Sequence, residues 1–264
     1  MQRFPGLPGR VILRAGVVAV LLLCGALQAE DDADNTWFKH FYQTQDVARF
    51  DAYWNRVMTE RWLSQRNVAP PLIGFVSQVV HRHPALIKGR LDQPREFPGE
   101  QKDAILQMLW LSNTPEARAV LVAAGETELA NAPPPPIAAR VIRSGGDLDV
   151  CWGWFFATGD RAALEPIIRT LDYVTAVGAM DRYKSGPKTP ETKAAAVQEV
   201  LFRAAAWSLS ANARENPDVL QALQAAAKDP QAPHVRQVGL ARLIANAAAP
   251  VAKPAPASTP PEGR

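Results

Sequence analysis

The sequence predicts an all-α protein made of helical hairpins that stack irregularly, in the manner of an α-solenoid. Apolar residues recur at helical spacing along most of the chain, and no segment alternates with the period of two that a strand needs. Short turns with Pro, Gly and capping residues separate the helical segments. The hairpins resemble each other without a fixed period, so a compact helical bundle stays an alternative.

Residues 1–29 have the three parts of a secretory signal peptide. Arg residues precede an apolar run from Val17 to Leu23, and small or polar residues then lead to Ala29. The run is shorter than the roughly 20 residues that a spanning helix needs, which disfavours an uncleaved anchor. We therefore expect cleavage after Ala29, with Ala26 as the alternative position.

Export sets where the protein is expected to reside, which is the periplasm or the outside of the cell. Lipid attachment through Cys24 is the less favoured alternative, because Leu23 stands where a small residue usually precedes a lipidated Cys. No transmembrane segment is expected after the signal peptide is removed. The mature chain is expected to form one helical domain over 30–248, followed by a disordered tail rich in Pro and Ala over 249–264.

Cleavage also changes the charge and the cysteine content. The full chain has 29 Lys and Arg against 26 Asp and Glu, and the signal peptide removes three Arg and no acid, leaving 26 of each. A neutral mature chain gives no electrostatic reason to expect binding to nucleic acid. Cys151 is then the only cysteine, so no intrachain disulfide forms. Its apolar neighbours predict a buried thiol and not a nucleophile.

The first half of the mature chain predicts a series of helices with clear boundaries. Pro70 and Pro71 begin one of them, and Thr114-Pro115-Glu116 begins another with a capping hydroxyl followed by Pro. The predicted helices are 30–44, a short docking helix; 46–66, with Asp46 as N-cap; 72–83; 85–91; 100–112; and 115–124, closed by Gly125.

The second half predicts further hairpins after the polyproline spacer of Pro133 to Pro136. Thr189-Pro190 and Asn216-Pro217 repeat the capping pattern, so each is expected to begin a helix. The predicted segments are a turn or two over 137–143; a helix over 148–157 capped by Asp147; a turn at Gly159-Asp160; a returning helix over 161–174; a polar loop over 181–188; and helices over 190–212, 217–228 and 234–247.

Two of the predicted helices hold a Gly among large apolar residues. Gly74 lies in Leu-Ile-Gly-Phe-Val, and Gly153 lies in Cys-Trp-Gly-Trp-Phe. A Gly inside a helix costs about 1 kcal/mol relative to Ala. We therefore predict that a neighbouring helix approaches closely at these positions.

No sequence motif for metal, nucleotide or nucleophilic catalysis is present, so we expect no cofactor and no metal. The sharpest candidates for a site are Asp149 and Asp160, which flank Trp152, because carboxylates beside tryptophans can bind or hydrolyse sugars. The alternative is that Asp147 and Asp160 are the N-caps of two successive helices and the aromatic residues between them form core. Arg182 and Tyr183, in the predicted polar loop, are further candidates for a binding site.

The stretch from Leu148 to Asp160 resembles a Leu-Asp-x-x-Trp-Gly-x-Phe-Phe-Ala-Thr-Gly-Asp signature. Together with Pro71-Leu-Ile-Gly-Phe-Val and Leu109-Trp110-Leu-Ser, it is similar to a family of uncharacterised exported proteins of Gram-negative bacteria. The resemblance covers roughly residues 68–210. It implies helices and export, and it implies no reaction.

These observations favour a non-enzymatic scaffold whose groove binds a peptide or another protein of the periplasm or envelope. The hairpin pattern and the absence of catalytic motifs support this hypothesis. The first alternative is a hydrolase that uses Asp149 or Asp160 near Trp152. A toxin-neutralising immunity protein is a second alternative, and no residue in the chain singles it out. The sequence leaves the oligomeric state open.

Overall fold

A computed structural model describes residues 29–248 of the chain. Over this range the protein is all α, with twelve α-helices joined by 3-10 turns and short loops, and it contains no strand. The predicted fold class is confirmed. No helix in the described part has the length and apolar character needed to cross a membrane. The predicted signal peptide and the predicted tail over 249–264 lie outside the described residues, apart from Ala29.

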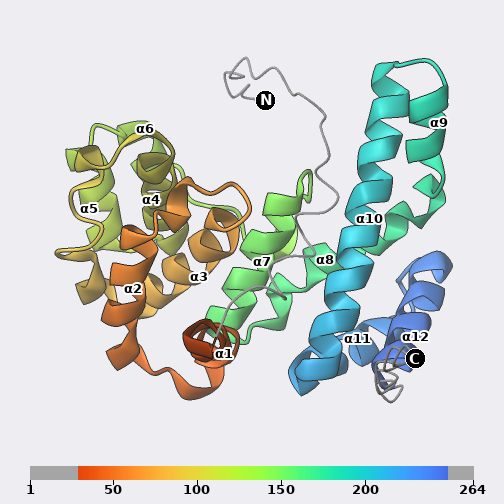
Figure 1. Cartoon of the computed structure of the whole chain (residues 1–264), viewed down its shortest axis with the longest axis horizontal. Helices are drawn as coiled ribbons and strands as arrows, with labels where there is room; N and C mark the ends of the chain where they lie inside the picture. Colours follow the sequence, from red (N-terminus) through yellow and green to blue (C-terminus); the bar gives the residue numbers. More distant parts are fainter. Residues whose placement is uncertain (1–28, 249–264) are drawn as a thin grey trace, which may run out of the picture.

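The helices gather into two groups on either side of a central pair (Figure 1). The first group contains α2 (Phe50–Thr59), α3 (Ala69–Arg82), α4 (Gly99–Ser112), α5 (Pro115–Ala123) and α6 (Thr127–Asn131). The central pair is α7 (Gly145–Thr158) and α8 (Glu165–Arg169). The second group contains α9 (Ala179–Ser185), α10 (Pro190–Glu215), α11 (Pro217–Ala227) and α12 (His234–Ala248).

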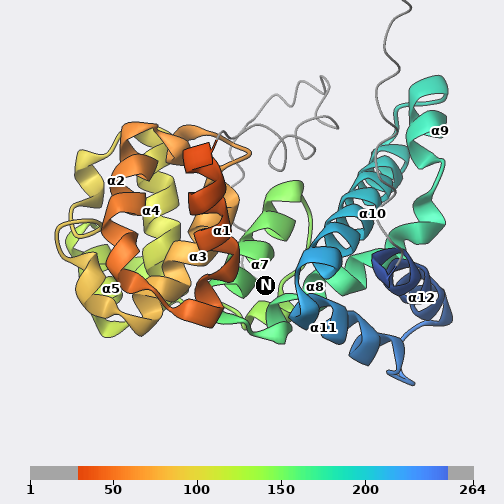
Figure 2. The same cartoon turned by 60° about the horizontal axis from the view of Figure 1, so that its bottom comes forward.

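Helix α1 (Ala29–Thr44) lies beside α3 and α7, between the two groups (Figure 2). Its aromatic residues pack around the ring of Phe75 in α3, with centroid distances of 5.5 Å from Trp37, 4.4 Å from Phe38 and 5.2 Å from Phe41. The sequence-based prediction of a short docking helix at this position is confirmed.

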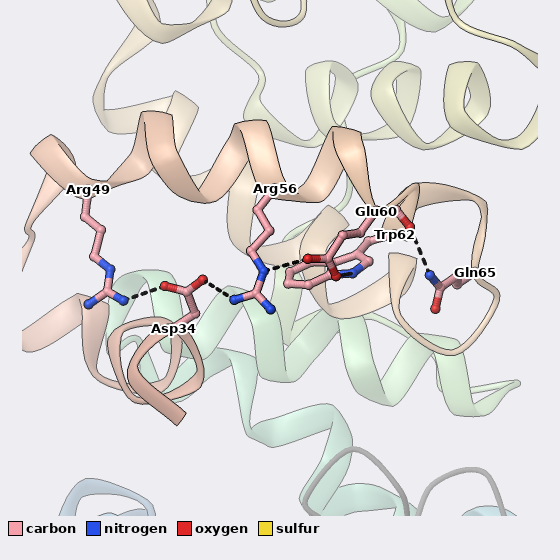
Figure 3. A network of polar contacts seen from close by, with 6 residues as sticks. All are labelled: Asp34, Arg49, Arg56, Glu60, Trp62 and Gln65. Atoms are coloured by element: carbon pink, nitrogen blue, oxygen red, sulfur yellow. Dashed lines mark hydrogen bonds and ion pairs between the residues drawn. The ribbon is translucent and has the colours of Figure 1, made fainter. Parts of the chain in front are cut away.

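An acid near the start of α1 fixes it to α2 (Figure 3). Asp34 accepts hydrogen bonds from Arg49 and Arg56, the second at 2.9 Å. Arg56 also donates to Glu60 at 2.8 Å, and Glu60 accepts from the indole of Trp62 at 2.8 Å. This network lies largely at the surface, so we expect it to orient α1 more than to stabilise the fold.

At its C-terminal end, α1 contacts the second group. The Tyr42 ring lies against Gly159. Its hydroxyl donates to Asp218 Oδ2 at 2.7 Å and also lies 3.1 Å from Asn216 Oδ1. Lys39 pairs with Glu215 at 2.9 Å. Helix α1 therefore joins both groups of helices by direct side-chain contacts.

The predicted Pro-containing helix starts are confirmed. The Thr114 hydroxyl caps α5 by accepting from the backbone N–H of Ala117 at 3.1 Å. Thr189 caps α10, where the side chains of Thr189 and Thr192 each accept from the backbone N–H of the other residue. Asn216 caps α11. Each of the three helices has Pro in its first turn, where the missing N–H leaves no hydrogen bond unmade.

The predicted boundaries of the segment 46–66 are wrong. Asp46 makes no capping bond from its side chain, and the chain first forms a 3-10 turn over Val47–Arg49. Helix α2 ends at Thr59, because Arg61 adopts the left-handed conformation with φ of 56°. The prediction of one helix over 85–91 is also corrected to a 3-10 turn over Pro84–Ile87.

Three predictions in the second half need correction. Ser144, not Asp147, is the N-cap of α7, and Asp147 at the third helical position accepts from the Ser144 backbone N–H. The segment 161–174 is not one helix, since 3-10 turns flank the short α8 on both sides. The predicted polar loop over 181–188 contains most of α9.

Helices α3 and α7 make the closest contact of the molecule, and both of the singled-out glycines lie in it. A Cβ atom on Gly74 would overlap the carbonyl oxygen of Val150, and a Cβ atom on Gly153 would overlap the carbonyl oxygen of Pro71. The contact is thus reciprocal, with each glycine pressed on the backbone of the other helix. The predicted close approach is confirmed at both positions.

Candidate functional site

Helix α7 carries two of the predicted site residues, Asp149 and Trp152. Helical spacing places Asp149, Trp152 and Phe156 on one face, because residues three and four apart are neighbours on a helix. Gly153, which is pressed against α3, lies four residues after Asp149 and therefore on the same side of the helix. Asp149 and Trp152 are therefore brought together by the fold.

Asp149 is half-buried and lies in none of the hydrogen bonds or ion pairs found among the described residues. Burial raises the pKa of its carboxyl group from 3.8 to about 7, and no neighbouring charge contributes to the shift. Arg140, which precedes α7, pairs with Asp147 at 3.0 Å and not with Asp149. Asp149 is a desolvated carboxyl group without a partner in the described part of the chain.

Trp152 belongs to the core. It is 5% exposed, and its ring stacks on Phe156 with centroids 5.6 Å apart and planes 23° apart. The indole Nε1–H is buried and has no hydrogen-bond acceptor. A buried N–H without a partner is uncommon in folded proteins, since it loses its bond to water and gains none.

Asp160 lies beyond the end of α7 and has a structural role. Its carboxylate accepts from the backbone N–H of Ala162 at 2.9 Å and caps the following 3-10 turn. Helix α7 rises by about 14 Å from Asp149 to Thr158, at about 1.5 Å per residue. Glycosidases hold their two carboxyl groups roughly 5 to 10 Å apart. The structure therefore does not bring Asp149 and Asp160 together as an acid and base pair.

Arg182 and Tyr183 lie on α9, away from the other candidates. Helix α9 packs on α10, at the far end of that helix from α1 (Figure 1). The Tyr183 ring receives the ammonium group of Lys188, which lies 4.4 Å from the ring centroid. These contacts stabilise the turn between α9 and α10, and Arg182 and Tyr183 do not share a site with Asp149.

Cys151 is fully buried, as its neighbours predicted. Burial is the largest cause of a thiol pKa raised to about 12. A thiol in this state carries almost no thiolate at neutral pH, and thiolate is the reactive form. The structure thus supports the interpretation of Cys151 as a small core residue.

Two cavities among the described residues are open and shallow. One of about 200 Å³ lies between the start of α3 and α4, and includes Ile73, Glu100 and Asp103. Another, of about 480 Å³, lies beside α1 and includes Trp37, His40 and Arg49. Neither contains Asp149 or Trp152. Within residues 29–248, no three or more His, Cys, Asp or Glu side chains gather in a way that could hold a metal ion.

Sequence reasoning missed a row of apolar residues on α10. Val197 and Trp207 are 37% and 38% exposed, and Val200 and Ala204 lie half-buried between them. The spacing of these four residues places them on one face of the helix. We call these four residues the α10 face. Their periodicity was visible in the sequence, but a periodic apolar row does not by itself tell a buried face from an exposed one.

No protein-family model matches the chain, and no curated protein or solved structure matches it. The arguments about function therefore rest on the residues and their geometry.

Proposed function

We propose that this protein is an exported, non-enzymatic helical scaffold of the periplasm that binds a peptide or another protein on the α10 face. The observation that carries the proposal is that Trp207 on α10 is 38% exposed. Tryptophan is enriched among the residues that dominate binding energy at protein interfaces. Val197, Val200 and Ala204 extend the apolar surface along the same helix.

Two exposed valines outside the second group, Val122 and Val141, differ from this arrangement. Val122 on α5 and Val141 before α7 are 50% and 58% exposed, but they stand singly and not in a row along one helix. Single apolar residues at the surface are normal, whereas contiguous ones favour an interaction site. Val122 thus supplies a matched control for Trp207.

Export rests on the N-terminal sequence. Cleavage after Ala29 would leave Trp37, Phe38 and Phe41, which pack on Phe75, in the mature chain. N-terminal sequencing of the protein from a periplasmic fraction tests this part. A chain that begins at Glu30 or Leu27 supports export, and a chain found only in the cytoplasm with Met1 retained would refute it.

Site-specific photocrosslinking tests the binding surface. A photoreactive phenylalanine at position 204 is expected to give one discrete adduct in cells, and the same group at position 122 is expected to give none. The partner, identified by mass spectrometry and purified, should bind the Trp207→Ala variant about tenfold or more weakly. Binding by Val122→Ala should be unchanged. Equal losses for both variants, or no adduct at position 204, would exclude the α10 face as the binding surface.

A further inference from the structure

The cavity between the start of α3 and α4 has an apolar floor. Its volume is about 200 Å³, which is below the roughly 300 to 1,000 Å³ of pockets that hold drug-sized ligands. Leu63, Ile73 and Ala104 line it, and they are 2%, 6% and 3% exposed. A space of this size on an apolar floor fits one long side chain, or a small molecule with an apolar stem.

The polar side chains around this cavity come mainly from one face of α4. Glu100, Asp103 and Gln107 follow one another at helical spacing, and all three are exposed. Ser64, in the 3-10 turn Trp62–Ser64, adds a hydroxyl group from a second element. The mouth of the cavity thus offers carboxylate, amide and hydroxyl oxygens, each of which can accept a hydrogen bond.

The mouth carries more negative than positive charge. The described residues that line the cavity include two acids, Glu100 and Asp103, and one base, Arg66. Arg66 lies 3.8 Å from Glu100 and its side chain is 93% exposed, so this ion pair contributes little. The neighbouring Lys102 pairs with Glu126 at 3.6 Å. The Asp103 carboxylate takes part in none of the ion pairs found among the described residues, so it is available to an external cation.

The position of the acids in α4 accounts for one of them and not for the other. Glu100 lies in the first turn of the helix, where an acid complements the helix dipole. Asp103 lies one turn further on, where that effect has fallen off. An apolar floor below an unpaired carboxylate is complementary to a ligand with an apolar stem and a cationic tip.

We propose that this cavity binds a primary alkylammonium group on a stem of about four carbons, as in a lysine side chain. The stem lies on Leu63 and Ile73, and the ammonium group stays at the mouth, in the way that lysine buries its methylenes and keeps its charge in water. An ammonium group donates three hydrogen bonds around a compact charge, so it serves oxygens of several residues. A guanidinium fork instead matches a single carboxylate. The site lies in the first group of helices and goes beyond the binding proposed for α10.

Titration with n-butylammonium, followed by NMR of the methyl groups, tests the site. We expect the methyl resonances of Leu63, Ile73 and Ala104 to shift with a Kd of about 1 to 10 mM. The neutral probe 1-butanol has the same stem and should bind about fivefold more weakly. No shift of these methyl groups with n-butylammonium, or equal binding of the two probes, would overturn the proposal.

A lysine peptide separates the two sources of such a group, a free amine and a partner protein. Acetyl-Gly-Lys-Gly-amide should shift the same methyl resonances if the cavity accepts a lysine side chain. Binding of n-butylammonium without binding of the peptide would assign the cavity to free alkylamines. Both results support an alkylammonium site, and each names its source.

Substitutions at the mouth test the role of the charges. Asp103→Asn should weaken n-butylammonium binding about threefold, because it removes the unpaired carboxylate. Arg66→Gln should strengthen binding about twofold, because it removes a competing cation beside Glu100. Glu128→Gln, at an exposed position on α6 outside the cavity, is the matched control and should leave binding unchanged.

The substituted positions are exposed, so thermal unfolding of the three variants should match that of the parent. Unchanged binding by both Asp103→Asn and Arg66→Gln, or an equal loss in Glu128→Gln, would show that these charges do not hold the ligand and would refute the site. Crosslinking at position 204 reports on α10, so a failure of the alkylammonium site leaves the proposal for the α10 face intact.

Discussion

The α3–α7 contact and the helices of the second group are built in different ways. At the contact, two glycines let the backbones touch, and aromatic residues of α1 and α7 close the surrounding space. In the second group, three of the seven buried residues of the long helix α10 are alanines, namely Ala196, Ala205 and Ala213. Burying an Ala removes far less apolar surface from water than burying a Phe or Leu.

In the second group, hydrogen bonds and ion pairs offset part of the smaller apolar burial. Glu199 of α10 is buried and accepts from the backbone N–H of Met180 at 2.7 Å and from Arg203. Arg236 of α12 makes a two-pronged ion pair with Asp172. The comparison suggests a rigid centre at α3 and α7, and a second group that opens more readily and presents the α10 face.

The largest difference is expected between two tryptophans, one in each region. Trp152→Ala should lower the free energy of unfolding by about 3 to 5 kcal/mol, because it removes a large buried ring that packs on Phe155 and Phe156. Trp207→Ala should cost under about 1 kcal/mol, because its ring is 38% exposed. Urea unfolding of both variants measures this. Similar losses for the two would show that the α10 face is part of the core.

Glycine-to-alanine substitutions are expected to have the next largest effect on stability. They should destabilise the protein at the α3–α7 contact and stabilise it in the second group. Gly153→Ala should destabilise by about 3 kcal/mol, because the new methyl group meets the backbone of α3. Gly239→Ala on α12 should stabilise by about 0.5 to 1 kcal/mol, because nothing lies near the added atom and Ala favours the helix. Thermal unfolding compares the pair. A Gly153→Ala protein as stable as the parent would disprove the close contact.

A pH series at Asp149 sharpens the description of α7. Its folded-state pKa is raised from 3.8 to about 7, so folding keeps the carboxyl protonated where the unfolded chain ionises. Stability attributable to this group is thus full below about pH 4 and is lost as the pH rises through 7. The free energy of unfolding of Asp149→Asn, measured relative to that of the parent, should therefore be about 1 to 3 kcal/mol higher at pH 8 than at pH 4.

The comparison at Asp149 is made by chemical denaturation at four pH values, with the exposed Asp103→Asn variant as background. A gap between the parent and Asp149→Asn that is the same at pH 4 and pH 8 would contradict the buried, unpaired carboxyl. The opposite trend would mean that a cation of the protein already neutralises Asp149.

A substitution of Glu199 tests the hydrogen bonds and ion pair that this buried carboxylate makes in the second group. Its expected effect on stability is the smallest. Hydrogen bonds from Met180 and Arg203 lower its carboxyl pKa from 4.5 to about 2. The stability it contributes is present above about pH 4.5 and is lost as the pH falls toward 2. Glu199→Gln should cost about 1 kcal/mol at pH 7, and less at pH 3. A loss that stays constant between these pH values would rule out an ionic contribution.

Local patterns in the sequence predicted much of the fold. The starts of α5, α10 and α11 followed from a capping residue before Pro, and the close contact followed from Gly74 and Gly153. These features depend on a few neighbouring residues, so they can be read without the tertiary structure. The helix ends at Thr59 and the helical turn of α9 depended on packing and left-handed backbone, which no local pattern announced.

The candidate site was predicted only in part. The sequence named Asp149 and Trp152, but it also named Asp160 and Arg182, which the structure places elsewhere. Every Asp near a helix end looks alike in a sequence, whereas the hydrogen bond from Ala162 to Asp160 and the burial of Asp149 depend on the folded structure. The exposure of Trp207 likewise depends on which helices cover α10, and periodicity does not reveal this.

Native-state hydrogen exchange tests the central comparison most directly. With increasing low concentrations of denaturant, the backbone N–H groups of Val150 and Trp154 in α7 should exchange only by global unfolding. Those of Ala205 and Leu209 in α10 should exchange through a smaller opening of the second group, at a lower free energy. Equal exchange free energies in α7 and α10, with the same denaturant dependence, would contradict a rigid centre joined to a group that opens more readily.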